Sequence, residues 1–143
     1  MPISEQTRKQ VLAVLDRFSE CYGKKDIDGV LALFDLHIRG FGTGADETVI
    51  GREQYRQQLE REFAEAEKIS LEFSDIRMSG EGTIVWLMGG MAVEATVDGK
   101  SLRMPMRMTC VLRGTGHAWI IAQMHFSLPA AGQEPGRSFT GSA

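Results

Sequence analysis

The spacing of apolar residues changes from a helical period in the first half of the chain to a strand period in the second half. After Ser4, apolar residues recur every three or four positions up to Tyr22, which predicts a long amphipathic helix with Ser4 as its N-cap. A short second helix is expected after Asp26, with Phe34 at the end of its apolar face. A third helix is expected over residues 52–67, with a solvated face of Arg, Glu and Gln.

A glycine-rich stretch lies between the second and third expected helices. Ile38 and Phe41 predict a short strand there, and glycines at 40, 42 and 44 loosen it. This glycine spacing superficially resembles a phosphate-binding loop. It lacks the strand–loop–helix context that such a loop needs, so we interpret it as a flexible turn.

From Ile69 onward, apolar and polar residues alternate, and turn signals divide the segment into strands. A long strand over residues 83–97 carries Gly89-Gly90, which predicts a bulge or a bend. Asp98-Gly99 is a strong two-residue hairpin signal. Because turn length determines register, we expect Glu94 opposite Arg103 and a methionine-rich apolar face on the hairpin.

The last strand, expected over residues 117–129, is rich in β-branched and aromatic residues, as a strand buried on both faces would be. Its register has two solutions. A two-residue turn places Gln123 and His125 on the methionine face. A three-residue turn instead sends Met124 and Phe126 to that face, with Gln123 opposite Arg107, and polarity matching favours this second register.

Composition predicts one soluble domain. The chain has 143 residues and a net charge of −3, which argues against a nucleic-acid partner. No apolar run is long enough for a membrane span and no signal segment is seen at the N-terminus, so we expect a cytoplasmic protein without a membrane partner. Cys21 and Cys110 lie in apolar patterns and are expected as free thiols. We expect the domain over residues 1–129 and a flexible tail over 130–143.

The chain resembles the SnoaL-like branch of the nuclear transport factor 2-like superfamily, and also the association (hub) domain of calcium/calmodulin-dependent kinase II. The matching positions are Trp119, Ile121, His125 and Ser127 of a W-x-I-x-x-x-H-x-S ending, Gly42-Thr43-Gly44 with Asp46-Glu47, and Gly51-Arg52-Glu53. The resemblance implies an α+β, cone-shaped fold, with three N-terminal helices packed on a curved, mostly antiparallel sheet around a conical pocket. It also implies homodimers through the convex sheet face, which here would carry Arg107, Gln123 and His125.

The hub domain's pocket arginines are absent from this chain. Phe126 stands at the position of one, and Cys110 aligns with the other. These differences argue against a carboxylate-binding pocket of the hub type.

The candidate chemistry is limited. No Asp or Glu lies between Gly99 and Gln133, so the late-strand acid of the related ketosteroid isomerases is missing, and Asp35 and His37 remain as acid/base candidates. The three histidines lack metal-ligand spacing, so neither a metal nor another cofactor is expected. The expected pocket residues are mostly apolar: Phe18, Tyr22, Phe34, Tyr55, Phe63, Met104, Met106, Met108, Met124 and Phe126. Three functions remain open: binding of a hydrophobic small molecule, an isomerase, dehydratase or cyclase acting on such a molecule, and a dimerisation module without a ligand.

Overall fold

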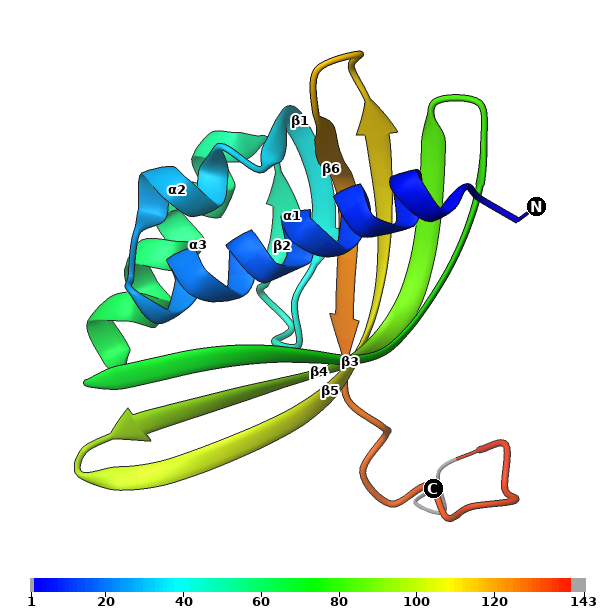
Figure 1. The fold of residues 1–143 in the computed structure, drawn as a ribbon. Coiled ribbons are helices and arrows are strands. Elements are labelled where there is room, and N and C mark those ends of the chain that lie inside the picture. The colour runs from blue at the N-terminus through cyan, green and yellow to red at the C-terminus, as the bar shows by residue number, and fades with distance from the viewer. Residues whose placement is uncertain (1, 140–143) are drawn as a thin grey trace.

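The computed structural model describes residues 2–139 and contains three helices and six strands within them (Figure 1). In chain order the elements are α1 (Glu5–Gly23), α2 (Ile27–Leu31), β1 (Phe34–Phe41), β2 (Thr48–Ile50), α3 (Arg52–Glu65), β3 (Lys68–Glu81), β4 (Ile84–Val97), β5 (Lys100–Gly114) and β6 (Trp119–Ser127). The expected N-cap of α1 is confirmed, because the Ser4 hydroxyl accepts the Thr7 backbone N–H at 3.1 Å.

The six strands form one curved sheet in the order β2-β1-β6-β5-β4-β3. The β1–β6 pair is parallel, and the other four pairs are antiparallel. Figure 1 shows the three helices together on one side of the bent sheet. The predicted fold class is therefore confirmed: an α+β domain with N-terminal helices packed on a mostly antiparallel sheet.

Two helices are shorter than the sequence pattern predicted. The second helix ends at Leu31, and Phe34 begins β1 instead of ending the helix. The third helix ends at Glu65, because Ala66 is already extended and the Lys25 ammonium group donates a hydrogen bond to its carbonyl. Phe34 would be buried at the end of a helix and is buried at the start of β1, so the apolar pattern alone does not distinguish the two.

The β4–β5 hairpin has the predicted register. Val97 pairs with Lys100 across the Asp98-Gly99 turn, and the Arg103 guanidinium donates to the Glu94 carboxylate at 2.6 Å. The expected bulge at Gly89-Gly90 does not interrupt this pair. The irregularity lies instead in β3, between Ser74 and Arg77, on the other side of β4.

The register of β6 differs from both predicted solutions. The β5–β6 turn spans four residues, since Gly114 pairs with Trp119, and a further shift occurs between Val111 and Leu112. Gln123 therefore lies opposite Val111, not Arg107. The inward positions of the favoured solution are nevertheless correct, because Met124 is buried and pairs with Cys110.

The hydrophobic core fills the space between the helices and the concave face of the sheet. Its most completely buried large side chains are Phe18, Phe34, Leu15, Ile38, Leu59, Met108, Leu112 and Ile121. Both cysteines are buried free thiols. No helix within residues 2–139 is long and apolar enough to span a membrane.

The chain after β6 runs away from the sheet (Figure 1). Residues 130–139 form turns without a helix or strand and are exposed. Residues 140–143 of the expected tail lie outside the described residues, so the tail boundary and its flexibility stay predictions.

Candidate functional site

A cavity of about 250 Å³ lies between α1, α3 and the concave face of the sheet. Its wall along β4, β5 and β6 is apolar and rich in methionine. Phe41, Thr43 and Glu65 are exposed residues that line it, so the cavity opens to solvent near the end of β1 and the loop that follows.

The structure brings eight of the ten expected pocket residues together at this cavity. They are Phe18, Tyr22, Phe34, Tyr55, Met104, Met106, Met124 and Phe126. Phe63 and Met108 are buried in the core instead, and the Phe63 ring packs edge-on against Tyr22 with their centroids 5.0 Å apart.

The two acid/base candidates lie away from the cavity. Phe34 and Ile38 of β1 face the core, so Asp35 and His37 between them point to the other side of the strand. The Arg113 guanidinium donates to the Asp35 carboxylate at 2.7 Å, and the His37 backbone N–H donates to it at 2.8 Å. These hydrogen bonds lower the pKa of Asp35. Asp35 is therefore held as an ion-paired carboxylate, and neither residue reaches the lining.

Polar side chains gather along the α3 side of the cavity. Tyr55, Gln58 and Glu62 follow one another at spacings of three and four, which places them on one stripe of α3. Tyr22 approaches from α1, and Glu47 from the loop before β2. The face of this helix expected to be solvated therefore contributes two side chains, Gln58 and Glu62, to the cavity.

Glu62 has the most perturbed carboxyl group at this site. Burial, followed by the nearby negative charge of Glu47, raises its pKa to about 7, while hydrogen bonding from Gln58 and Tyr22 and the charge of Arg61 oppose the rise. A carboxyl group with a pKa near 7 exchanges its proton readily at neutral pH.

The two tyrosine hydroxyls remain protonated. Burial raises the pKa of Tyr22 and of Tyr55 well above the usual value, and the Glu62 charge adds to both shifts. Tyr55 is only 8% exposed, and its hydroxyl makes no hydrogen bond with any of residues 2–139. It is therefore available to a molecule inside the cavity.

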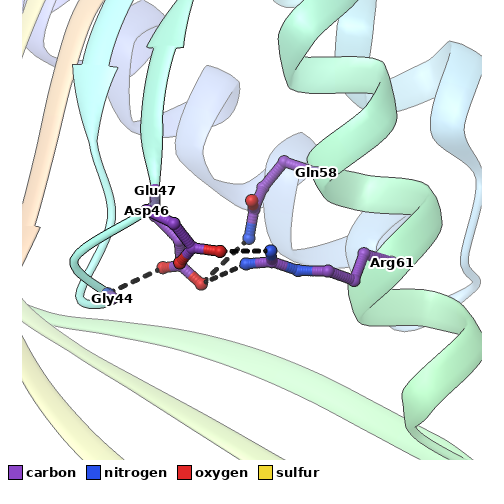
Figure 2. A network of polar contacts seen from close by, with 5 residues as sticks. All are labelled: Gly44, Asp46, Glu47, Gln58 and Arg61. Atoms are coloured by element: carbon purple, nitrogen blue, oxygen red, sulfur yellow. Dashed lines mark hydrogen bonds and ion pairs between the residues drawn. The ribbon is translucent and has the colours of Figure 1, made fainter.

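Glu47 is anchored in a polar network at the cavity rim (Figure 2). One carboxylate oxygen accepts the Gly44 backbone N–H at 3.1 Å. The other accepts the Gln58 amide at 3.1 Å and the Arg61 guanidinium at 2.9 Å. Arg61 also binds Asp46 at 2.9 Å, so the loop and α3 are tied together and Glu47 keeps a defined position beside Glu62.

The loop before β2 needs glycine at residue 42. The Gly42 backbone N–H donates to the Glu47 carbonyl at 2.7 Å, and a Cβ at residue 42 would collide with the Glu47 carboxylate. The glycine-rich stretch thus forms a turn, as expected, and folds closely around an acidic side chain; its flexibility stays a prediction.

No metal site is formed at the cavity or elsewhere in residues 2–139, where no three His, Cys, Asp or Glu side chains are grouped to hold an ion.

Comparison with solved structures identifies the fold. The chain matches a nuclear transport factor 2-like superfamily protein from Salmonella enterica with a TM-score of 0.83 and 14% identity, covering 96% of this chain and 100% of the other. A protein from Streptomyces avermitilis, provisionally named a dehydratase of this family, matches with a TM-score of 0.80 and 18% identity. The match covers 90% of this chain and 100% of the other. A provisionally named calcium/calmodulin-dependent protein kinase II association domain from Xanthomonas campestris matches with a TM-score of 0.76 and 19% identity. The match covers 85% of this chain and 86% of the other. The chain thus has the nuclear transport factor 2-like fold.

A match to a family model identifies the family within this fold. The model described as the SnoaL-like domain matches residues 11–131, which is most of the chain. The chain belongs to the SnoaL-like family, as the sequence motifs indicated. The search of curated proteins finds no match.

Sequence reasoning missed the acidic side of the cavity. Glu62 is three positions after the buried Leu59 and directly before the buried Phe63, so it borders the apolar stripe of α3. Gln58 likewise stands directly before the buried Leu59. Polar residues at the border of an apolar helical stripe were the available signal, but their burial depends on β2 and the loop before it.

Proposed function

We propose that this chain binds a small, mostly apolar molecule in the cavity, with a polar group of that molecule beside Tyr22, Tyr55 and Glu62. The observation that carries this proposal is the combination of an apolar cavity of about 250 Å³ with polar groups on one side. Ligand sites commonly have this character: apolar walls with a few convergent polar groups.

The proposal is tested by filling the cavity. Ala95 lines it from β4, whereas Ala92 lies on the opposite face of the same strand. Ala95→Trp should weaken binding of the neutral apolar dye N-phenylnaphthylamine by about tenfold or more, and the matched Ala92→Trp should leave it unchanged. Dye fluorescence measures binding by both variants. Equal binding by the two variants, or no binding to the wild-type protein, would contradict the proposal.

A second candidate is an enzyme that transfers a proton within the same cavity. The observation that favours it is the Glu62 carboxyl group, whose pKa of about 7 suits general acid/base work at neutral pH. The Streptomyces protein provisionally named a dehydratase is in line with such chemistry. Here Glu62, and not Asp35 or His37, is proposed to take a proton from a carbon acid, with the Tyr55 hydroxyl as a hydrogen-bond donor to the substrate.

This candidate predicts a specific kinetic pattern. For a substrate that is turned over, Glu62→Gln should lower kcat by about a hundredfold or more, while Asp35→Asn and His37→Ala should have little effect. The wild-type rate should rise with pH through an inflection near 7 as Glu62 ionises. A rate that is insensitive to Glu62→Gln would exclude Glu62 as the base.

Self-association through the convex face is proposed as well. Trp86 and Met88 on β4 are 42% and 59% exposed although both are large and apolar. They lie in cross-strand rows that end at Gln123 and His125 on β6, with the exposed Arg107 close by on β5. A second copy of this chain would cover these side chains.

A further inference from the structure

The charged side chains that line the cavity all have the same sign. Three of its lining residues are acidic: Glu47, Glu62 and Glu65. No lysine, arginine or histidine is among the lining residues within the described chain. Arg61 binds Asp46 and Glu47 from outside this lining and does not belong to it. Arg61 is already bound to Asp46 and Glu47, so a bound carboxylate or phosphate would meet like charges and no cation in the lining.

An independent observation indicates that the cavity has a polar subsite. The Tyr55 side chain is more than nine-tenths buried and lines the cavity, and its hydroxyl has no hydrogen-bond partner within residues 2–139. A hydroxyl on an otherwise buried side chain can find a partner only in the cavity that it faces, so a ligand group is expected to satisfy it. Tyr22, which is 6% exposed, adds a second hydroxyl beside Glu62.

We infer that the ligand is a hydrophobic amine, whose protonated nitrogen lies beside the Glu62 carboxylate and the hydroxyls of Tyr22 and Tyr55. An ammonium group has three N–H donors and no acceptor, and these three side chains offer oxygen acceptors on the same side of the cavity. The apolar body would lie against the methionine wall formed by Met91, Met106 and Met124. This inference rests on the proposed function, because it assigns the chemical class of the ligand in that same cavity.

Binding of an amine should be linked to the proton on Glu62. A nearby ammonium group favours the carboxylate, so amine binding should release this proton where the free protein still holds it. The groups that face Glu62 are Glu47 from the loop before β2, Tyr22 from α1 and Arg61 from α3. Burial and then the Glu47 charge raise the pKa of this carboxyl to about 7, whereas Arg61 favours ionisation. Amine affinity should therefore rise between about pH 5.5 and about pH 8.

Three probes of nearly equal size test the inference: benzylamine, benzyl alcohol and benzoate. Isothermal titration calorimetry at about pH 8 should give an affinity for benzylamine about tenfold or more above that for benzyl alcohol, with benzoate the weakest. Glu62→Gln should remove the preference for the amine. The matched control Glu60→Gln changes an exposed glutamate on the same helix and should leave the preference intact.

A second variant keeps the test independent of how well Glu62→Gln folds. Tyr55→Phe removes the unpartnered hydroxyl and should weaken benzylamine binding severalfold more than benzyl alcohol binding. In the wild-type protein, the heat of amine binding at about pH 6 should depend on the ionisation enthalpy of the buffer, because a proton is released.

The possible outcomes separate the inference from the proposed function. If benzyl alcohol or benzoate binds as tightly as the amine, and Ala95→Trp weakens that binding, the cavity binds ligands but the amine inference is wrong. If benzylamine binds equally to the wild-type protein and to Tyr55→Phe and Glu62→Gln, the inference is wrong again. If neither the probes nor N-phenylnaphthylamine binds, both proposals are wrong.

Discussion

Replacing Glu62 by glutamine should stabilise the folded protein, and the gain should depend on pH. The fold raises the pKa of Glu62 from 4.5 to about 7, chiefly by burial and then by the charge of Glu47. As pH rises from 4.5, this carboxyl ionises first in the unfolded chain, while the folded protein still holds the proton. The free energy of unfolding therefore falls between pH 4.5 and about 7, and above that range the loss is complete.

The size of the effect follows from this pKa. At about 1.4 kcal/mol for each pH unit, a rise from 4.5 to about 7 corresponds to about 3 kcal/mol of lost stability. Glu62 is partly exposed, and water will screen some of this cost, so about 2 kcal/mol is the expected loss. Glutamine has nearly the shape of the protonated side chain and does not ionise. Glu62→Gln should thus match the wild-type protein at about pH 4.5 and exceed its stability by about 2 kcal/mol at about pH 8.

Urea unfolding, followed by circular dichroism at several pH values from about 4.5 to about 8, measures this difference directly. Glu60→Gln is the control, because it removes one exposed glutamate from the same helix and should give a difference near zero at each pH. A Glu62→Gln gain that does not change with pH would refute the reasoning, since it would show that Glu62 ionises normally in the folded protein.

Three further predictions concern the neighbouring charge, the convex face and the core. Glu47→Gln should lower the pKa of Glu62, as measured by NMR titration of its carboxyl carbon, whereas Asp46→Asn, which also loses an Arg61 contact, should change it less. Arg107→Glu should weaken self-association in sedimentation velocity, with Lys9→Glu on the exposed side of α1 as control; unchanged profiles would argue against the convex interface. Ile121→Ala should cost about 3 kcal/mol in urea unfolding and Leu128→Ala less than about 1 kcal/mol, because Ile121 is fully buried and Leu128 is exposed; equal losses would contradict this core assignment.

The β4–β5 hairpin shows what short-range sequence signals can predict. Asp98 and Gly99 both adopt positive φ angles, 51° and 76°, as the two central residues of such a turn require. A two-residue turn leaves one register, and every later pair follows from it. The Glu94–Arg103 ion pair was predictable because it depends only on this local turn and on counting residues.

The register of β6 depends on longer-range contacts and was not predictable in the same way. The Thr115 hydroxyl accepts the backbone N–H groups of His117 and Ala118, which stabilises a four-residue turn in place of a shorter one. The parallel pairing of β6 with β1 then adds an irregularity of its own, between Phe34 and Arg39. Only the inward direction of Met124 and Phe126 was predicted correctly, because it follows from the apolar pattern and not from the turn.

The polar side of the cavity was hidden for a physical reason. Helical periodicity gives the direction of a side chain but not what lies opposite it, and Glu62 borders the apolar stripe of α3. Its burial results from Tyr22 on α1 and from the loop that holds Glu47, both distant in sequence. The pattern could therefore predict an apolar cavity and most of its walls, but it could not assign the acid.

The Tyr55 hydroxyl and the Glu62 carboxyl lie in the same cavity, and this proximity is the strongest argument that the cavity has a ligand. The Tyr55 hydroxyl has no hydrogen-bond partner within residues 2–139, and the raised pKa of Glu62 means that ionisation of this carboxyl destabilises the fold. Scattered through the core, such groups would indicate only imperfect packing. Tyr55 and Glu62 instead line the same cavity from one stripe of α3, two helical turns apart. A molecule that supplies a hydrogen-bond donor and a positive charge at this stripe would pair with the Tyr55 hydroxyl and stabilise the ionised Glu62 at once.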